Sequence, residues 1–457
     1  MGRRCRAWLP RFATVSTPAD DGHQTAQNDP LAPAPWDDSG GGTRITTVRA
    51  ILTAPENITL VVVKIETSEP GLYGLGCATF TQRAQAVAEA VDSYLAPQLI
   101  GRDPADITDL ASSLLVSSYW RFGPVLNNAL SGVDMALWDL KGKQAGMPVW
   151  QLLGGRCRTA VPVYAHASGR DAAEVEDAVR RYVEEGYRYV RCQVAIPGAL
   201  TYGAPSAPVG DTPSDESTAA LPIRPSLTPS AWEPDAYLRV VPALFAHLRD
   251  KLGPDVHLLH DVHERLHPTQ AVRLAKELEP FHLFFLEDLL APEDLGWLPT
   301  VRAQCATPLA IGELFTNPAE YVPLVRDRLI DFVRCHISAI GGLTPAWRLA
   351  SACELFGIRT AWHGPGDVSP LGHAANLALD LAAPNFGIQE QHVFNETARD
   401  VFPGCPEIRD GHLWPSDAPG LGVDLDEELA AKFPPVAPLA HDRWTRTRLP
   451  DGTVQRP

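Results

Sequence analysis

Three acidic residues follow one another at a regular interval, each at the end of a short apolar run. The runs VHLLHD, LFFLE and PLAIGE end in Asp261, Glu287 and Glu313, so that 26 residues separate each acid from the next. In neighbouring parallel strands the three carboxylates would meet at one edge and raise one another's pKa unless a cation neutralised them. An all-oxygen set with open positions suits Mg²⁺. The alternative is that each acid only caps the following helix, and three acids in phase make that explanation the weaker one.

A histidine stands two positions after the first of these acids. Side chains alternate along a strand, so Asp261 and His263 are expected to point to the same side. Imidazole titrates in the range that proton transfer near neutral pH requires. The pair therefore predicts acid–base chemistry beside the carboxylates, with a solvated histidine in a capped loop as the alternative.

Eight short apolar runs, most of them separated by amphipathic stretches, must position these residues. They lie at 161–165, 187–193, 256–261, 283–287, 308–313, 331–337, 358–363 and 386–390. Strands that alternate with helices favour a parallel sheet, and this many units favour a closed α/β barrel. The rival arrangement is a doubly wound open sheet. It would carry a glycine-rich phosphate loop, and the sequence contains no G-x-G-x-x-G or Walker motif.

The barrel is expected over residues 156–394, after a small α+β domain at 44–155. That domain opens with strand-like runs, which glycines punctuate as hairpin turns would, and continues with helices that include 127–145. Residues 1–43 are rich in Asp, Pro, Gly and Ser and are interpreted as a disordered tail or a mis-assigned start. The Pro-, Ser- and Thr-rich stretch 197–234 is expected to form a long loop over the active-site face.

The composition limits the classes of partner. The 457 residues contain 39 Lys and Arg against 55 Asp and Glu, a formal net charge of −16, which argues against nucleic acid or an anionic membrane as partner. No apolar run approaches the length of a membrane span. The eight cysteines show no C-x-x-C spacing and are interpreted as reduced thiols of a cytoplasmic protein.

Longer motifs carry a family resemblance from residue 44 to about residue 435. They are SSYWRFGPV, VDMALWDLKGKQAGMP, LLGG, VYAHASG, HDVHERL, LEDLLAPE, IGELF, AIGGLT, WHGPGD and PNFGIQE. With the three acids, they resemble the enolase superfamily, and more closely its mannonate dehydratase subgroup, which also contains gluconate dehydratases. The resemblance implies an α/β fold: a modified (β/α)7β TIM-like barrel with an N-terminal α+β capping domain, which residues 395–457 would complete. It also implies a homo-oligomer.

The same resemblance implies a Mg²⁺-dependent hydro-lyase. Such an enzyme dehydrates an acid sugar, a small-molecule substrate, to a 2-keto-3-deoxy acid through an enediolate. The three strand-end acids would hold the metal ion. Tyr202 would remove the proton at C2 with its pKa lowered by Arg191, and His263 would protonate the departing hydroxyl. The alternative for Tyr202 is a loop aromatic that only packs on the long loop.

Five further residues match family positions that contact the substrate or support the site: Thr81, His166, His363, Asp367 and Glu390. For His166 the alternative is a buried structural histidine. Thr81 stands where the family typically has Asn, Pro365 stands where efficient mannonate dehydratases tend to have Ala, and the stretch DGTVQRP lacks a Trp that often closes over the substrate. The residues of enolisation are therefore complete, whereas those that select the substrate differ.

Two other functions stay open from the sequence. An acid epimerase or racemase needs bases on opposite faces of the substrate, and Tyr202 and His363 could supply them. A catalytically weak relative that acts as a sensor or binding protein would fit the altered substrate wall. The complete set of three acids argues against that second alternative.

Overall fold

A computed structural model describes residues 42–196, 232–437 and 448–456 of the chain. The described residues from Thr43 onward belong to one compact unit. Tyr202 and nearly all of the expected loop 197–234 lie outside the described residues. The domain boundaries given above therefore stay predictions.

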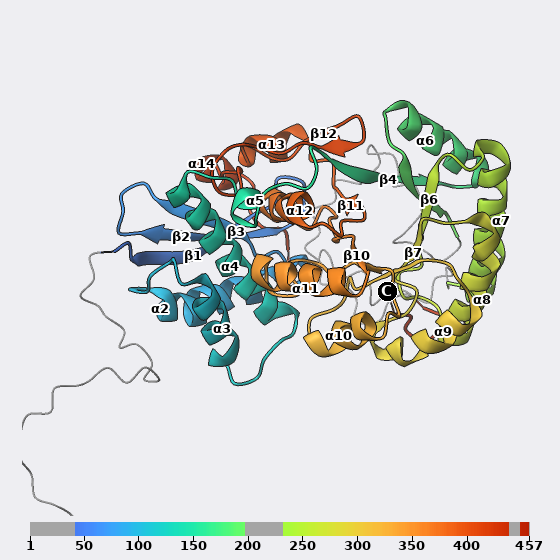
Figure 1. Cartoon of the computed structure of the whole chain (residues 1–457), viewed down its shortest axis with the longest axis horizontal. Coiled ribbons are helices and arrows are strands. Elements are labelled where there is room, and N and C mark those ends of the chain that lie inside the picture. The colour runs from blue at the N-terminus through green and yellow to red at the C-terminus, as the bar shows by residue number, and fades with distance from the viewer. Residues whose placement is uncertain (1–41, 197–231, 438–447, 457) are drawn as a thin grey trace, which may run out of the picture. The chain divides into compact units, whose positions relative to one another are not determined.

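An antiparallel sheet with the order β1-β2-β3 opens the described chain, and α4 packs across β3 and β2. In Figure 1 this sheet lies with α2, α3 and α4 at one end of the compact unit. The elements are β1 (Ile45–Thr53), β2 (Leu60–Thr67), β3 (Tyr73–Cys77), η1 (Thr81–Arg83), α1 (Ala84–Glu89), η2 (Ala90–Leu95), α2 (Ala96–Leu99), α3 (Ile107–Ser117), α4 (Pro124–Ala145) and α5 (Val149–Leu152).

Two glycines of β3 serve close packing rather than the turns expected of them. A Cβ on Gly74 would lie 2.0 Å from the carbonyl oxygen of Ala136, and one on Gly76 would lie 2.1 Å from that of Gly132. Both oxygens belong to α4, so the helix backbone sits directly on the strand. Gly71, with a φ of +80°, does occupy the turn before β3.

Gly76→Ala should therefore destabilise the protein by about 2–3 kcal/mol, because the added methyl group must push a helix backbone away from a packed sheet. Gly296→Ala is the matched control, since a Cβ there meets no atom within 4 Å among the described residues and its φ is not positive. Urea unfolding would measure both variants. Equal midpoints for the two would contradict the close contact between β3 and α4.

The second sheet is a parallel barrel. Its strands run in the order β10-β9-β8-β7-β6-β5-β4, β11 pairs with β4, and a bridge between Thr360 and Phe386 joins the two ends. All eight expected strands are present and the expected fold class is confirmed. The strands are β4 (Val161–Gly169), β5 (Tyr189–Val194), β6 (His257–Asp261), β7 (Phe285–Glu287), β8 (Leu309–Ile311), β9 (Phe332–Val333), β10 (Arg359–Thr360) and β11 (Gln389–Glu390).

Helices surround the barrel, and α6 to α9 curve round the side away from the small sheet (Figure 1). They are α6 (Ala172–Glu184), α7 (Pro234–Leu252), α8 (Pro268–Leu278), η3 (Glu279–Phe281), η4 (Pro292–Trp297), α9 (Leu298–Gln304), α10 (Pro318–Arg326), α11 (Leu343–Leu355) and α12 (Pro370–Ala382). Seven buried side chains fill the barrel interior: Tyr164, Leu259, Phe285, Ala310, Phe332, Ala361 and Ile388. They come from seven of the eight barrel strands or the residues next to them, and the exception is β5.

The described residues within 395–457, a segment expected to complete the capping region, contact both parts of the unit. Their elements are α13 (Glu396–Val401), β12 (Ile408–Arg409), β13 (His412–Leu413) and α14 (Glu427–Ala430). Glu427 of α14 pairs with Arg49 of β1 at 2.6 Å and with Lys64 of β2 at 2.7 Å. In contrast, β13 pairs with β4 of the barrel, and 448–456 contacts loops at the barrel.

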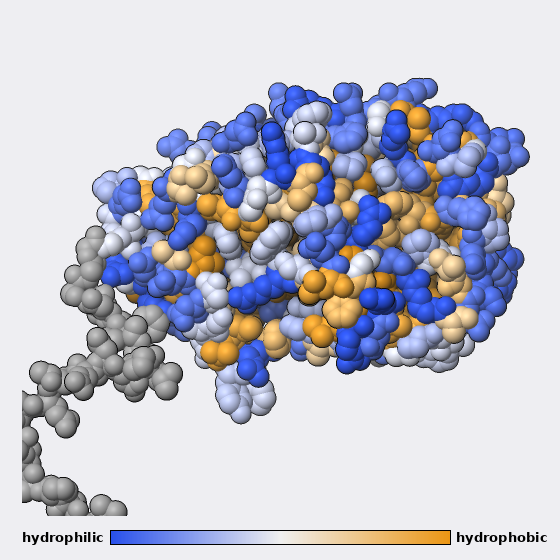
Figure 2. All heavy atoms as spheres, viewed as in Figure 1, coloured by the Kyte–Doolittle hydropathy of each residue, from blue (hydrophilic) through white to orange (hydrophobic). Residues whose placement is uncertain are grey.

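The surface shown in Figure 2 carries small groups of hydrophobic side chains, separated by hydrophilic ones. The large apolar side chains are instead concentrated in the interior clusters of the two sheets. Among the described residues, no helix combines the length and apolar character needed to cross a membrane.

Candidate active site

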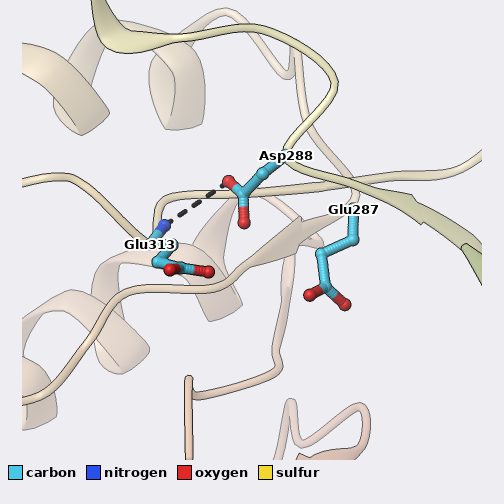
Figure 3. Close-up of side chains that lie close together, drawn as sticks. All are labelled: Glu287, Asp288 and Glu313. Atoms are coloured by element: carbon cyan, nitrogen blue, oxygen red, sulfur yellow. Dashed lines mark hydrogen bonds between the residues drawn. The ribbon is translucent and has the colours of Figure 1, made fainter. Parts of the chain in front are cut away.

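The carboxyl ends of the barrel strands, called the barrel mouth below, bring the expected acids together. Asp261 is the register partner of Glu287 across β6 and β7, so the two residues end their strands at the same level. Glu313 follows two residues after β8, and its carboxylate faces Glu287 and Asp288 (Figure 3). One oxygen from each of Glu287, Asp288 and Glu313 lies within 4.8 Å of the others. The cluster thus contains two of the three expected ligands plus Asp288.

A glycine turns Glu313 toward this cluster. Along β8, Ala310 faces the barrel interior while Leu309 and Ile311 pack outward, so strict alternation would send residue 313 outward as well. Gly312 breaks the alternation with a φ of +142°, a backbone conformation that L side chains rarely adopt.

Asp288 has a backbone role as well as a place in the cluster. Its Oδ1 accepts hydrogen bonds from the backbone N–H groups of Gly312, at 2.9 Å, and Glu313, at 3.4 Å. The second of these bonds is drawn in Figure 3. Asp288 therefore joins the end of β7 to the turn after β8, and its own φ of +37° is left-handed.

Arg334 lies at the centre of the barrel mouth and is completely buried. Its guanidinium group contacts four carboxylates and one phenol: Glu390 at 2.6 Å, Glu287 at 2.8 Å, Glu313 at 3.0 Å, Asp288 at 3.3 Å and the Tyr164 hydroxyl at 3.4 Å. Charge-assisted contacts of this number make Arg334 the main cationic partner of the acids.

Arg191, at the middle of β5, is the second cation. Its Nη1 lies 2.7 Å from Glu287, 3.3 Å from Glu390 and 3.5 Å from Asp261, and the residue is 4 % exposed. Arg191 is therefore a fixed, buried positive charge at the barrel mouth. Tyr202, which was expected to be the catalytic base, lies outside the described residues.

The charges at the barrel mouth do not balance. Among the ion pairs of the described residues, five carboxyl groups (Asp261, Glu287, Asp288, Glu313 and Glu390) face two guanidinium groups (Arg191 and Arg334). Burial raises the pKa of Glu287 well above its usual value and that of Asp288 to about 7, although Arg334 opposes both shifts. Burial would also raise the pKa of Glu390, but Arg334, His166 and Arg191 hold it well below its usual value. The surplus of buried negative charge favours binding of either protons or a cation.

His263 lies beside this group, as expected. Its backbone N–H donates to Asp261 Oδ1 at 2.7 Å, and its Nε2 lies 3.9 Å from Glu313 Oε1. Burial lowers the pKa of the His263 imidazole, while Asp261 and Glu313 act in the opposite direction. The imidazole is therefore placed to exchange a proton with a molecule bound at the acids.

Two more expected histidines lie near different oxygens of Glu390. His166 Nε2 lies 3.1 Å from Glu390 Oε1, and His363 Nε2 lies 3.8 Å from Glu390 Oε2 and 3.3 Å from Glu313. His363 Nδ1 is 2.9 Å from Nδ1 of His336, which stands after β9. Burial lowers the pKa of His336 to about 3 and that of His363 well below its usual value, so this pair is neutral at pH 7.

The other two expected substrate contacts, Asp367 and Thr81, have different surroundings in the structure. Burial raises the pKa of Asp367 to about 6, and among the described residues its Oδ1 has no hydrogen-bond partner. Thr81 is buried in the small α+β part, where its hydroxyl donates to the carbonyl of Thr59 at 3.1 Å. The structure thus unites Asp261, Glu287, Glu313 and their neighbours, but it engages Thr81 in a local backbone bond.

Sequence reasoning missed three members of this site: Asp288, Arg334 and His336. Arg334 had a readable signal, because alternation in the run DFVRCHI puts it on the same side as Phe332, inside the barrel. A buried arginine needs carboxylate partners. Asp288 directly follows Glu287, and alternation alone would have pointed it away from the site.

Comparison with known proteins adds independent evidence. Residues 43–154 match the family model described as "Mandelate racemase / muconate lactonizing enzyme, N-terminal domain". Residues 174–429 match the one described as "Enolase C-terminal domain-like".

Individual relatives are similar over nearly their whole length. The D-galactonate dehydratase family member RspA of Pantoea ananatis is 55% identical, over 90% of this chain and 99% of the relative. A D-galactonate dehydratase family member of Catenulispora acidiphila is 52% identical, over 94% of this chain and 97% of the relative. A crystal structure of an enolase from Pantoea ananatis with bound D-gluconate and Mg is 55% identical, with a TM-score of 0.84 over 91% of this chain and 100% of that one.

These relatives confirm the superfamily and correct the name of the subgroup. The motifs suggested mannonate dehydratases, whereas the relatives are named for the D-galactonate dehydratase family. Both are groups of acid-sugar dehydratases, so the reaction class is unchanged. The chain belongs to the enolase superfamily, within the D-galactonate dehydratase family, and is an enzyme of the hydro-lyase class.

Proposed function

We propose that the chain dehydrates an aldonate, a linear acid sugar of the gluconate, galactonate or mannonate kind, to a 2-keto-3-deoxy acid. The observation that carries the proposal is the group of buried acids at the barrel mouth, with two arginines and three histidines around it. The bound D-gluconate and Mg of the Pantoea ananatis structure support the same substrate class and cofactor.

The acids fit a magnesium ion. Their donors are carboxylate oxygens, the atoms that Mg²⁺ prefers, and they carry more negative charge than the arginines neutralise. Within the described residues Asp261 Oδ2 is buried and accepts no hydrogen bond, and its cationic neighbour there is Arg191 at 3.5 Å. Glu287 and Glu313 would hold the ion together with Asp261 or Asp288. A bound Mg²⁺ would draw charge from the substrate carboxylate and stabilise the enediolate.

The side chains of the chain would divide the reaction between them. Tyr202 takes the proton from C2, with Arg191 favouring its phenolate form. The C3–O bond then breaks, and the oxygen leaves as water with a proton from His263. The resulting enol takes up a proton at C3 and becomes the keto acid. Arg334 would stay with the acids and limit their mutual repulsion.

The raised pKa of Asp288 should make the metal-free protein lose stability as the pH rises from 3.8 to about 7, while the buried histidines with lowered pKa values act in the opposite direction with or without Mg²⁺. Asp288 has a pKa near 3.8 when unfolded and about 7 when folded. Between these values the native state holds a proton that the unfolded state has lost, so stability falls with rising pH. Because Mg²⁺ takes the place of that proton, the Mg²⁺-induced rise in Tm should be larger at about pH 8 than at about pH 6.

Differential scanning calorimetry of chelator-treated and Mg²⁺-loaded protein would measure this difference. The comparison is made above about pH 5, where the pKa of Glu390, lowered by Arg334, leaves that group ionised in both states. Asp288→Asn should remove much of the pH dependence. A Mg²⁺ response that is the same at both pH values would contradict a protonated acid at the metal-free site.

A screen of aldonates with Mg²⁺ tests the function itself. The expected product is a 2-keto-3-deoxy acid, detected as its semicarbazone, with solvent deuterium at C3 when the reaction runs in D₂O. An acid that returns with inverted C2 and an intact 3-hydroxyl would identify an epimerase instead. No turnover of any aldonate, despite Mg²⁺ binding, would favour the sensor or binding protein.

A further inference from the structure

Residues 448–456 form a short hairpin. Arg448 and Val454 make an antiparallel bridge, the N–H of Leu449 donates to the Thr453 carbonyl at 2.9 Å, and Gly452 occupies the turn with a φ of +89°. The Arg448 carbonyl also accepts a hydrogen bond from the backbone N–H of Trp232 at 2.8 Å. These hydrogen bonds therefore give residues 448–456 a defined backbone conformation.

The end of the hairpin contacts the loops that follow two strands of the barrel mouth. Gln455 is 8 % exposed, and its side-chain amide donates to the carbonyl oxygen of Arg265, after β6, at 2.9 Å. Arg456 pairs with Asp294 at 2.6 Å and with Glu293 at 3.5 Å, both in η4 after β7. Segments almost two hundred residues apart in sequence are joined here.

The loop that Gln455 contacts contains two residues in an energetically unfavourable backbone conformation. His263 and Glu264 have φ values of +54° and +60°, in the left-handed region that non-glycine residues rarely adopt. Such a conformation persists only where the surrounding structure holds it. Asp261 Oδ1 accepts a hydrogen bond from the His263 N–H at 2.7 Å, and the Asp288 carbonyl accepts one from the Glu264 N–H at 2.8 Å. Gln455 holds the far end of the same turn.

We propose that Gln455 is a positioning residue for His263. It fixes the Arg265 carbonyl and with it the left-handed turn that directs the His263 imidazole toward Glu313. This inference rests on the proposed function, because His263 matters for catalysis only if it protonates the leaving hydroxyl. The ion pairs of Arg456 are partly exposed and contribute little by comparison.

Gln455→Met tests the proposal, since it keeps the length and volume of the side chain but removes the donor. Arg456→Gln is the matched control on the neighbouring residue. Gln455→Met should lower kcat for dehydration about tenfold with KM within about twofold, as expected for loss of one hydrogen bond. Exchange of the C2 proton with solvent should stay within about twofold of wild type, because that step belongs to Tyr202. Arg456→Gln should leave all three quantities nearly unchanged.

Amide hydrogen exchange gives a readout that does not need turnover. The peptide that contains residues 262–266 should exchange about tenfold faster in Gln455→Met than in wild type or Arg456→Gln. If wild type dehydrates no aldonate, the proposed function fails, while this measurement still decides whether Gln455 holds the turn. Unchanged amide exchange would overturn the inference. So would a parallel loss of dehydration and C2 exchange, since that pattern indicates general damage to the fold.

Discussion

Glu287→Gln should abolish turnover and remove the rise in Tm that Mg²⁺ gives the wild-type protein. Glu287 is completely buried, stands between Arg191 at 2.7 Å and Arg334 at 2.8 Å, and belongs to the oxygen cluster at the barrel mouth. A ligand that binds only the folded state stabilises it, by about 2.7 kcal/mol at one hundred times its Kd. Gln offers a weaker, neutral donor, so kcat/KM should fall at least about 10³-fold.

Asp139→Asn is the control for this prediction. Asp139 is an equally buried acid of α4 that pairs with Lys143 at 2.7 Å, apart from the barrel acids. Asp139→Asn is expected to have a lower Tm than wild type, but Mg²⁺ should raise its Tm by the same amount as in wild type. A Glu287→Gln protein with an undiminished Mg²⁺ increment would show that the ion binds elsewhere.

The identity of the third acidic ligand can be decided in the same experiment. The 26-residue spacing predicted Asp261, whereas the oxygens that lie within 4.8 Å of one another belong to Glu287, Asp288 and Glu313. Both oxygens of Asp288 accept hydrogen bonds, Oδ1 from two backbone N–H groups and Oδ2 from Arg334 at 3.3 Å. Asp261 Oδ2 accepts none among the described residues and is paired with Arg191 at 3.5 Å. We therefore expect Asp261→Asn to weaken the Mg²⁺ response more than Asp288→Asn does. The opposite order would correct the ligand set.

The parts of the site that were predictable share one property, which is that they follow from strand periodicity. Asp261 and Glu287 end apolar runs and lie on the same side as interior residues of their strands, so their meeting at the barrel mouth could be inferred. The spacing of one βα unit then made them neighbours. The same reasoning found all eight barrel strands.

The parts that were not predictable depend on local breaks of that periodicity. Glu313 faces the site only because Gly312 adopts a φ of +142°, and Asp288 does so with a left-handed backbone of its own. Gly74 and Gly76 looked like turn residues, although their role is to let α4 approach β3. No pattern in the sequence distinguishes a glycine for a turn from one for close packing.

Tyr202→Phe and His263→Asn should separate the two proton transfers of the proposed reaction. Tyr202→Phe removes the base and should lower both dehydration and C2 exchange by about 10²–10⁴-fold. His263→Asn removes only the acid, so dehydration should fall similarly while C2 exchange survives, because enolisation precedes loss of the hydroxyl. Proton NMR in D₂O follows the C2 signal, and semicarbazone absorbance follows the keto acid.

Arg191 provides a second test of the same division of labour. Arg191→Lys keeps the charge but loses the planar donors that now contact Glu287 and Glu390, so it should behave more like Tyr202→Phe than like His263→Asn. Tyr189→Phe, at the start of the same strand, where the ring stacks on His257, serves as the control and should leave both rates near wild type. Exchange that survived in Tyr202→Phe but vanished in His263→Asn would reverse the assigned roles. The C2 proton would then leave from the His263 side, and an epimerase-type reaction would become the better explanation of this site.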